Sequence, residues 1–135
     1  MQNQIIQWKK EYSIGIAEID EQHKKLVDIV NKFISAKMEG KQNDVFKETL
    51  TDIVEYTKYH FTSEENHMTV NKYFGLHEHK KQHQVLINQI VNVLNHLKEG
   101  KVNVDDELIS LLKSWLIIHM MEHDKEYGRF LNDKS

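Results

Sequence analysis

The chain contains no cysteine and no proline, and only five of its 135 residues are glycine. Without cysteine there is no disulfide, and zinc fingers and iron–sulfur clusters, which need thiolate ligands, are excluded. The absence of proline, of an internal repeat and of low-complexity sequence argues against a second domain or a long linker. We therefore expect one domain over residues 1–135, long enough to bury a hydrophobic core.

The sequence also lacks a long apolar run and a clustered basic region. No stretch approaches the roughly 20 apolar residues of a membrane span, and the start, MQNQIIQWKK, has no long apolar core of a signal peptide. The formal net charge is −3, with acidic and basic residues interleaved, whereas nucleic-acid binding requires a basic face. We expect a cytoplasmic protein with no membrane or nucleic-acid partner.

Four segments have the apolar period of an amphipathic helix, with core residues recurring at intervals of three and four. The most regular contains Leu76, His79, His83, Leu86 and Ile90. Because glycines near the segment ends break the pattern, we predict helices over four ranges: 20–38, 44–70, 76–98 and 104–131.

Long helices with short connections predict an all-α fold, an antiparallel up-down-up-down four-helix bundle over residues 20–135. Asp20 is the expected N-cap of the first helix. Residues 1–19 carry apolar side chains without sustained helical spacing, and we expect an extended N-terminal arm that packs on the bundle.

Histidine is unusually frequent, with nine in the chain. Five of them fall in the apolar stripes of the four helices: His23, His60, His79, His83 and His119. Residues four apart share one helix face, so Glu64 can reach the same point as His60. Burying five imidazoles without partners would cost several kcal/mol, and a bound metal removes that cost.

The donor set indicates two metal ions with carboxylates between them. A single zinc needs four ligands, fewer than this core offers, and imidazole mixed with carboxylate favours iron or manganese. Glu64 is one candidate bridge. Glu65 points about 100° away and is interpreted as a solvated charge.

The last helix offers two candidates for one further ligand. His123 lies four residues after His119, and Asp124 lies five residues after it. Regular helix geometry favours His123, because a spacing of five turns Asp124 roughly 140° away from His119. Spacing alone does not decide between the two.

The complete pattern resembles that of the hemerythrins, in particular the single-domain bacterial hemerythrins: His23, His60-x-x-x-Glu64, His79-x-x-x-His83 and His119-x-x-x-x-Asp124. The resemblance extends over nearly the whole chain, from Trp8 and Gly15-Ile16 to Tyr127. It departs at Phe74, where many relatives carry proline.

This resemblance implies two iron ions bridged by Glu64, Asp124 and an oxo or hydroxo group. One iron would be held by three histidines, His79, His83 and His119, and the other by two, His23 and His60. The family pattern thus selects Asp124 over His123. We therefore predict that the last helix is locally widened near residues 119–124, as in a π-type turn.

The function implied is reversible dioxygen binding at a non-haem di-iron centre, for oxygen storage, transport or delivery to an oxygen-using client enzyme. Such a protein is not an enzyme, and a monomer is favoured. The alternatives are a di-iron redox enzyme, or an oxygen or nitric-oxide scavenger or sensor, at the same site. Five apolar residues match positions that line the oxygen pocket of the family: Leu26, Phe61, Trp115, Leu116 and Met120.

Four histidines are left over. We interpret His67, His77 and His96 as surface residues, and expect His123 to line the site or to hydrogen-bond a ligand. The ligand imidazoles need outer hydrogen-bond acceptors, which the sequence does not identify.

Overall fold

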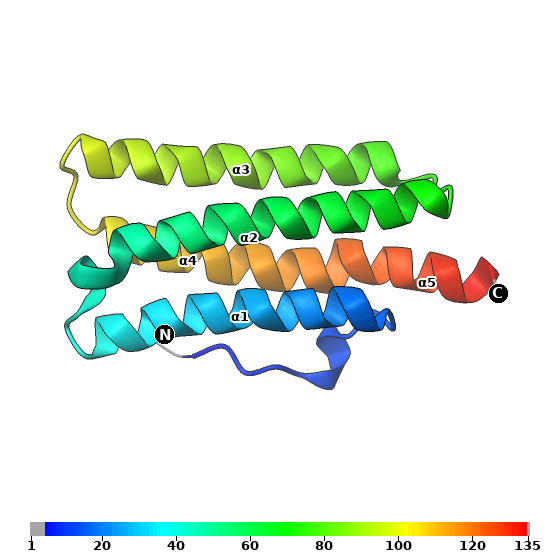
Figure 1. The fold of residues 1–135 in the computed structure, drawn as a ribbon, viewed down its shortest axis with the longest axis horizontal. Coiled ribbons are helices and arrows are strands. Elements are labelled where there is room, and N and C mark those ends of the chain that lie inside the picture. The colour runs from blue at the N-terminus through cyan, green and yellow to red at the C-terminus, as the bar shows by residue number, and fades with distance from the viewer. Residues whose placement is uncertain (1–4, 135) are drawn as a thin grey trace.

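The computed structural model describes the backbone of residues 5–134, with their side chains except those of residues 42, 120, 121 and 134. The helices are α1 (Ala17–Met38), α2 (Gln42–Val70), α3 (Leu76–Lys98), α4 (Val104–Ile118) and α5 (Lys125–Lys134). A π-helix, η2 (His119–Asp124), joins α4 to α5 in one continuous rod (Figure 1). Strands are absent from the described residues. The predicted all-α four-helix bundle is confirmed.

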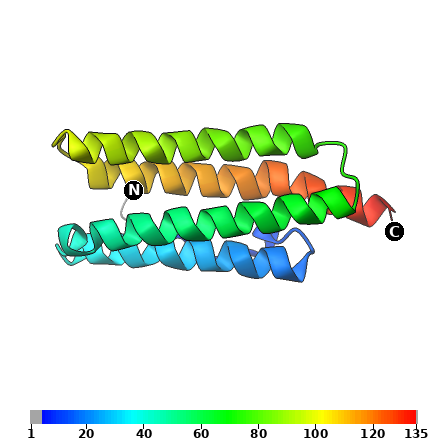
Figure 2. The ribbon, with the colours of Figure 1, turned by 45° about the horizontal axis from the view of Figure 1, so that its top comes forward.

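The four rods alternate in direction. In Figures 1 and 2, α1, α2, α3 and the rod formed by α4, η2 and α5 lie side by side and run antiparallel in turn. The beginnings of α1 and α3 therefore share one end of the bundle with the end of α2 and the middle of the last rod. The predicted ligands all fall in these parts of the helices, so the topology brings them to one level.

Glycine ends two of the helices. Gly40 follows α1 with φ +74° and Gly100 follows α3 with φ +73°, a left-handed conformation that costs glycine little. At the first of these ends, the Lys41 N–H donates to the Ala36 carbonyl at 2.7 Å, and the Gly40 N–H donates to the Lys37 carbonyl at 3.0 Å. This pair of bonds is a Schellman motif, and it turns the chain from α1 directly into α2.

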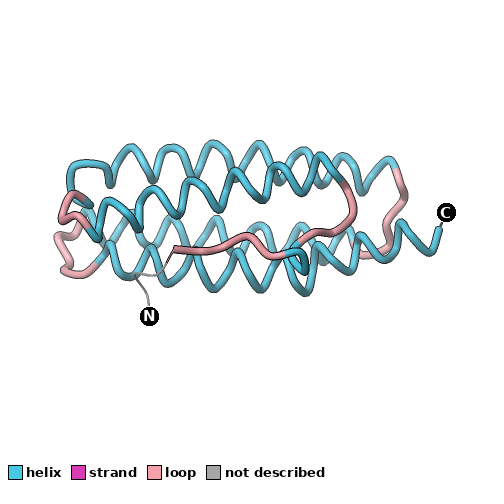
Figure 3. The backbone as a smooth tube through the Cα atoms, turned by 90° about the horizontal axis from the view of Figure 1, so that it is seen from below, coloured by secondary structure: helices cyan, strands magenta, loops and turns pink. Residues whose placement is uncertain are grey.

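The segment before α1 differs in part from the expected arm. Residues 5–16 run along the bundle (Figure 3) but include a one-turn 3₁₀ helix, η1 (Lys10–Tyr12). The helix α1 begins at Ala17, so Asp20 lies inside it and is not its N-cap. The Asp20 carboxylate instead accepts hydrogen bonds from Ser13 Oγ at 2.5 Å and from the Ile14 N–H at 2.9 Å. Asp20 was predicted to cap the first backbone N–H groups of the helix. Its carboxylate instead binds the segment that precedes α1.

The helices bury two hydrophobic clusters. The larger fills the bundle between the four rods and includes Leu26, Phe33, Ile53, Ile90 and Leu108. The smaller lies beside the turn between α2 and α3, around three buried residues: Met68, Tyr73 and Tyr127. Within the described residues, no helix has an apolar stretch long enough to cross a bilayer.

Gly128 in α5 allows the N-terminal segment to approach closely. A Cβ atom at this position would overlap the backbone carbonyl oxygen of Ile14. Backbone cannot swing away as a flexible side chain can, so this contact requires glycine although the residue lies inside a helix.

We predict that Gly128→Ala destabilises the protein, although Gly→Ala inside a helix normally raises the free energy of unfolding by about 1 kcal/mol. The expected loss in the free energy of unfolding is roughly 1–3 kcal/mol, the usual cost of overpacking, measured by urea denaturation. Glu126→Ala, at an exposed position of the same helix, is the control and should change stability little. A Gly128→Ala variant as stable as the wild type would contradict this packing.

Candidate metal centre

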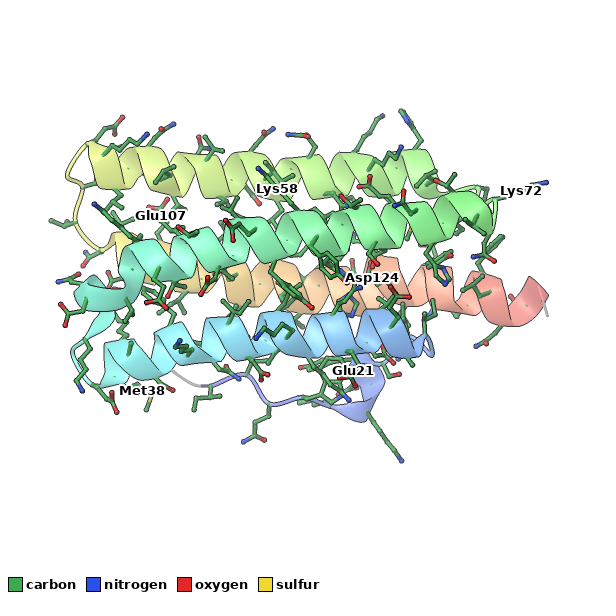
Figure 4. All side chains as sticks on the ribbon, in the orientation of Figure 1. Glu21, Met38, Lys58, Lys72, Glu107 and Asp124 are labelled. Carbon is green, nitrogen blue, oxygen red and sulfur yellow. The ribbon has the colours of Figure 1, made fainter. Side chains whose placement is uncertain are left out.

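The seven candidate ligands are buried together inside the bundle. Their donor atoms form two overlapping groups, and within each group these atoms lie within 4.8 Å of one another. The first group is Glu64, His79, His83, His119 and Asp124, and the second is His23, His60, Glu64 and Asp124. Figure 4 shows the labelled Asp124 in the interior, between the ribbons. We call these seven residues the donor cluster.

Glu64 faces both histidine groups with different oxygens. Its Oε1 lies 2.6 Å from His79 Nε2 and 3.1 Å from His83 Nε2. Its Oε2 lies 3.5 Å from His60 Nε2 and 3.8 Å from His23 Nε2. The carboxylate therefore stands between three histidines on one side and two on the other.

Asp124 is oriented in the same way. Its Oδ1 lies 2.8 Å from His119 Nε2 and 3.0 Å from His79 Nε2, while its Oδ2 lies 2.7 Å from His23 Nε2. Each carboxylate thus directs one oxygen to each histidine group, which is the arrangement of two bridging ligands.

Hydrogen bonds account for only some of these short distances: His79 Nε2 and His83 Nε2 lie within hydrogen-bond distance of Glu64 Oε1. His23 Nε2, His60 Nε2, Glu64 Oε2 and both carboxylate oxygens of Asp124 are buried and have no hydrogen-bond partner. His83 Nε2 and His119 Nε2 face each other at 3.3 Å. Bonds of about 2.1 Å would place neighbouring ligands of an octahedral cation about 3.0 Å apart. The unpaired atoms and their separations therefore fit metal ligands.

Charge within the cluster shifts its pKa values strongly. Burial would raise the pKa of Glu64 and of Asp124, but the imidazoles around them hold both well below the usual range. Burial would lower the pKa of His79 and His119, but the two carboxylates raise it to about 10 for His79 and about 8 for His119. Burial lowers the pKa of His60 to about 4. Without metal, protons on two imidazoles therefore balance the carboxylates at neutral pH.

The π-helix explains why Asp124 joins the cluster. The turn from His119 to Asp124 closes with π-helical geometry, in which the hydrogen bonds run from residue i to residue i+5 and residues five apart come together. The predicted widening of the last helix is confirmed. His123 is half-buried, outside both donor groups, with its ring centroid 5.8 Å from that of His119.

Comparison with known proteins agrees with this geometry. The hemerythrin HHE cation binding domain family matches residues 14–131 of the chain. The chain belongs to the hemerythrin family. This match includes all seven residues of the donor cluster.

Several hemerythrin relatives are similar over most of the chain. A bacteriohemerythrin of Pseudomonas aeruginosa is 33% identical over 120 residues, covering 89% of this chain and 77% of the relative. A bacteriohemerythrin of Methylococcus capsulatus is 28% identical, covering 90% of this chain and 92% of the relative. A myohemerythrin of Theromyzon tessulatum is 29% identical, covering 90% of this chain and 89% of the relative.

Two polar residues orient histidines of the hemerythrin site from outside. Gln22 Oε1 lies 2.7 Å from His60 Nδ1, and Gln22 Nε2 donates to Ser63 Oγ at 3.0 Å. Glu65 Oε2 accepts a hydrogen bond from His83 Nδ1 at 2.7 Å. The interpretation of Glu65 as a solvated charge was therefore wrong, because α3 packs beside the face of α2 that carries it.

Aromatic rings cover two histidines of the cluster. Phe61 stacks on His83 with ring centroids 3.6 Å apart, and Trp115 stacks on His119 at 4.3 Å. Leu26 and Leu116 are buried in the same hydrophobic core. The side chain of Met120, the fifth predicted pocket residue, lies outside the described residues.

The remaining histidines have separate environments. His77 is exposed as expected, and the half-buried His96 lies 2.7 Å from Glu107. His67 is not an isolated surface residue, because its Nδ1 lies 2.5 Å from the hydroxyl of the buried Tyr127. Chain spacing did not identify this pair, since 60 residues separate its members.

We predict that Glu65→Gln weakens metal binding by roughly 10- to 100-fold, because the carboxylate that orients His83 and raises its basicity is lost. Competition with a chelator measures the change. Glu122→Gln is the control, since it makes the same substitution at an exposed position near the cluster. Equal affinities for the two variants would exclude an orienting role for Glu65.

Metal binding should also release protons, because ligands must lose theirs before they coordinate. From the pKa values of His79 and His119, about 10 and about 8, roughly two protons should leave the imidazoles at pH 7 and roughly one at pH 9. A water that becomes a bridging hydroxo group would add one proton at either pH. The apparent affinity for the metal should therefore rise with pH until the pH exceeds the pKa values of both His79 and His119. Anaerobic titration of the metal-free protein with Fe²⁺, by calorimetry in buffers of different ionisation enthalpy, measures this number. Binding without proton release would contradict the charge balance described above.

Proposed function

We propose that the chain binds dioxygen reversibly at a pair of non-haem iron ions. The observation that supports this most is the orientation of Glu64 and Asp124, each with one oxygen directed to each histidine group. Membership of the hemerythrin family supports the same function.

The proposed ligands follow the two donor groups. His79, His83 and His119 would hold one iron, and His23 and His60 the other. Glu64, Asp124 and a solvent-derived oxo or hydroxo group would bridge them. A donor set rich in imidazole with two carboxylates suits iron.

Counting these ligands leaves one free position. With about six positions on each iron, five imidazoles, two bridging carboxylates and one bridging oxygen fill all but one. That position belongs to the side held by His23 and His60 alone. A bound iron pair would supply two electrons and this open position for dioxygen.

The surrounding side chains would favour release of oxygen over its reduction. We propose that Leu26, Phe61, Trp115, Leu116 and Met120 form the wall of the oxygen site. Leu26, Phe61 and Leu116 are each only 4% exposed, so they keep water and its protons away. Bound oxygen that receives no proton is less readily lost as peroxide, as in the apolar distal pockets of haem proteins.

Oxygen carriage is preferred here over redox catalysis. Ferritin-like di-iron oxidases use a carboxylate-rich set with Glu and His at a spacing of three, whereas this donor cluster has five histidines and pairs at a spacing of four. A client enzyme that receives the oxygen, a monomeric state and a cytoplasmic location remain predictions from the sequence.

Reversible binding can be tested with the reduced, iron-loaded protein. We expect a visible absorption change when oxygen is admitted, reversal when it is removed, and uptake of one oxygen molecule per chain. Asp124→Ala should lower the iron content below two per chain and abolish the reversible change, because it removes a bridge and a buried charge. Glu122→Ala is the matched control. Irreversible oxygen consumption by the wild type would favour the redox enzyme instead.

A further inference from the structure

A buried tyrosine is hydrogen-bonded to histidine one turn away from the donor cluster. Tyr127 has 0% exposure, and its hydroxyl lies 2.5 Å from Nδ1 of the half-buried His67. Tyr127 follows Asp124 by three residues, and His67 follows Glu64 by three. At about 1.5 Å of rise per residue, each member lies about 4.5 Å along its rod from a bridging carboxylate.

Asn71 lies beside this hydrogen bond. Its side-chain Nδ2 donates one hydrogen to the His67 carbonyl oxygen at 2.8 Å and lies 3.3 Å from the Tyr127 hydroxyl oxygen. The same nitrogen lies 3.4 Å from His67 Nδ1, so its second hydrogen faces both the phenolic oxygen and this ring nitrogen, and either can accept it. We assign the phenolic hydrogen to the bond with His67 Nδ1, in which this ring nitrogen is the acceptor.

Aromatic rings surround the buried ring of Tyr127. Tyr73 packs on its ring at a centroid distance of 4.8 Å and Phe130 at 6.3 Å, which excludes water. Burial raises the pKa of Tyr127 to about 12, and the nearby charge of Glu64 adds to the rise. The phenol therefore stays protonated at neutral pH, and it can lose an electron easily only if a base takes its proton at the same time.

We propose that Tyr127 and His67 form a proton-coupled redox pair that supplies one electron to the metal centre when hydrogen peroxide is reduced there. The proposal rests on the proposed di-iron site.

In this step Tyr127 loses one electron and its O–H bond breaks. The proton forms an N–H bond at Nδ1 of His67, which leaves a neutral tyrosyl radical and an imidazolium ion. Reduction of one hydrogen peroxide to two water molecules needs two electrons and two protons. One electron comes from Tyr127 and the other from a ferrous ion of the pair, and both protons come from solvent, because the proton of Tyr127 stays on His67. A small one-electron reductant such as ascorbate restores the phenol as the proton returns.

A purely structural hydrogen bond predicts a different response to substitution. A buried tyrosine hydroxyl usually has a partner, and glutamine at position 67 can supply an oxygen acceptor. Glutamine is a far weaker base than imidazole, so it preserves a hydrogen bond but not proton transfer. His67→Gln therefore separates the two roles.

The first experiment uses protein loaded with zinc, which has no redox chemistry of its own. Azide radical generated by pulse radiolysis oxidises the chain, and absorption reports the tyrosyl radical. We expect the wild type to form the radical on Tyr127 and His67→Gln to form it roughly 100-fold more slowly, the size of a typical general-base contribution. Tyr127→Phe should lose this radical, whereas Tyr59→Phe, at a position 58% exposed, should keep it. Equal rates in the wild type and His67→Gln would overturn the proposal.

The second experiment uses protein that holds one ferrous and one ferric ion, so that the pair can give the single electron that the step requires. Hydrogen peroxide is added, and the frozen sample is examined by electron paramagnetic resonance. We expect a tyrosyl signal in the wild type and in Tyr59→Phe, and none in Tyr127→Phe. A signal that persists in Tyr127→Phe would overturn the assignment. The zinc experiment involves neither iron nor oxygen, so failure of reversible oxygen binding and failure of this redox pair are distinguishable.

Discussion

The constraint on which the structure depends is the burial of two carboxylates and five imidazoles at one level of a small helical bundle. Each buried charge costs several kcal/mol of desolvation unless it is paired. Glu64 and Asp124 are fully buried, and their charges are balanced by protons on neighbouring imidazoles or by a bound cation. A bound cation stabilises a site of this kind, which couples metal binding to folding.

The fold meets this constraint through helix direction and one local distortion. Antiparallel packing brings the first turns of α1 and α3 to the same level as the last turns of α2, so ligands from distant parts of the chain meet. The π-helix η2 then turns Asp124 inward, where a regular helix would present His123. Local helical regularity is lost at this point, and the cluster gains its second carboxylate. π-Helical turns are frequent at functional sites for such reasons.

Beyond the ligands, residues one position or one turn away determine how the cluster behaves. Gln22 and Glu65 orient two imidazoles from outside, while Phe61 covers His83 with apolar carbon. The second hydrophobic cluster, which is built around Met68, Tyr73 and Tyr127, encloses Tyr127 beside His67. The proposed oxygen site and the proposed redox pair would therefore lie in one small core.

The sequence by itself determined where the helices lie and which five histidines face the core. Amphipathic periodicity and the spacing of four are local properties of a chain, so both can be read without the tertiary structure. It left the choice between His123 and Asp124 open on spacing alone; the family resemblance favoured Asp124, and the π-helix provides the physical reason. Only the tertiary structure decided the roles of Asp20 and Glu65, since both depend on which segment packs against a given helix face. A carboxylate about 100° from the core stripe is solvated on an isolated helix, but here α3 lies beside it.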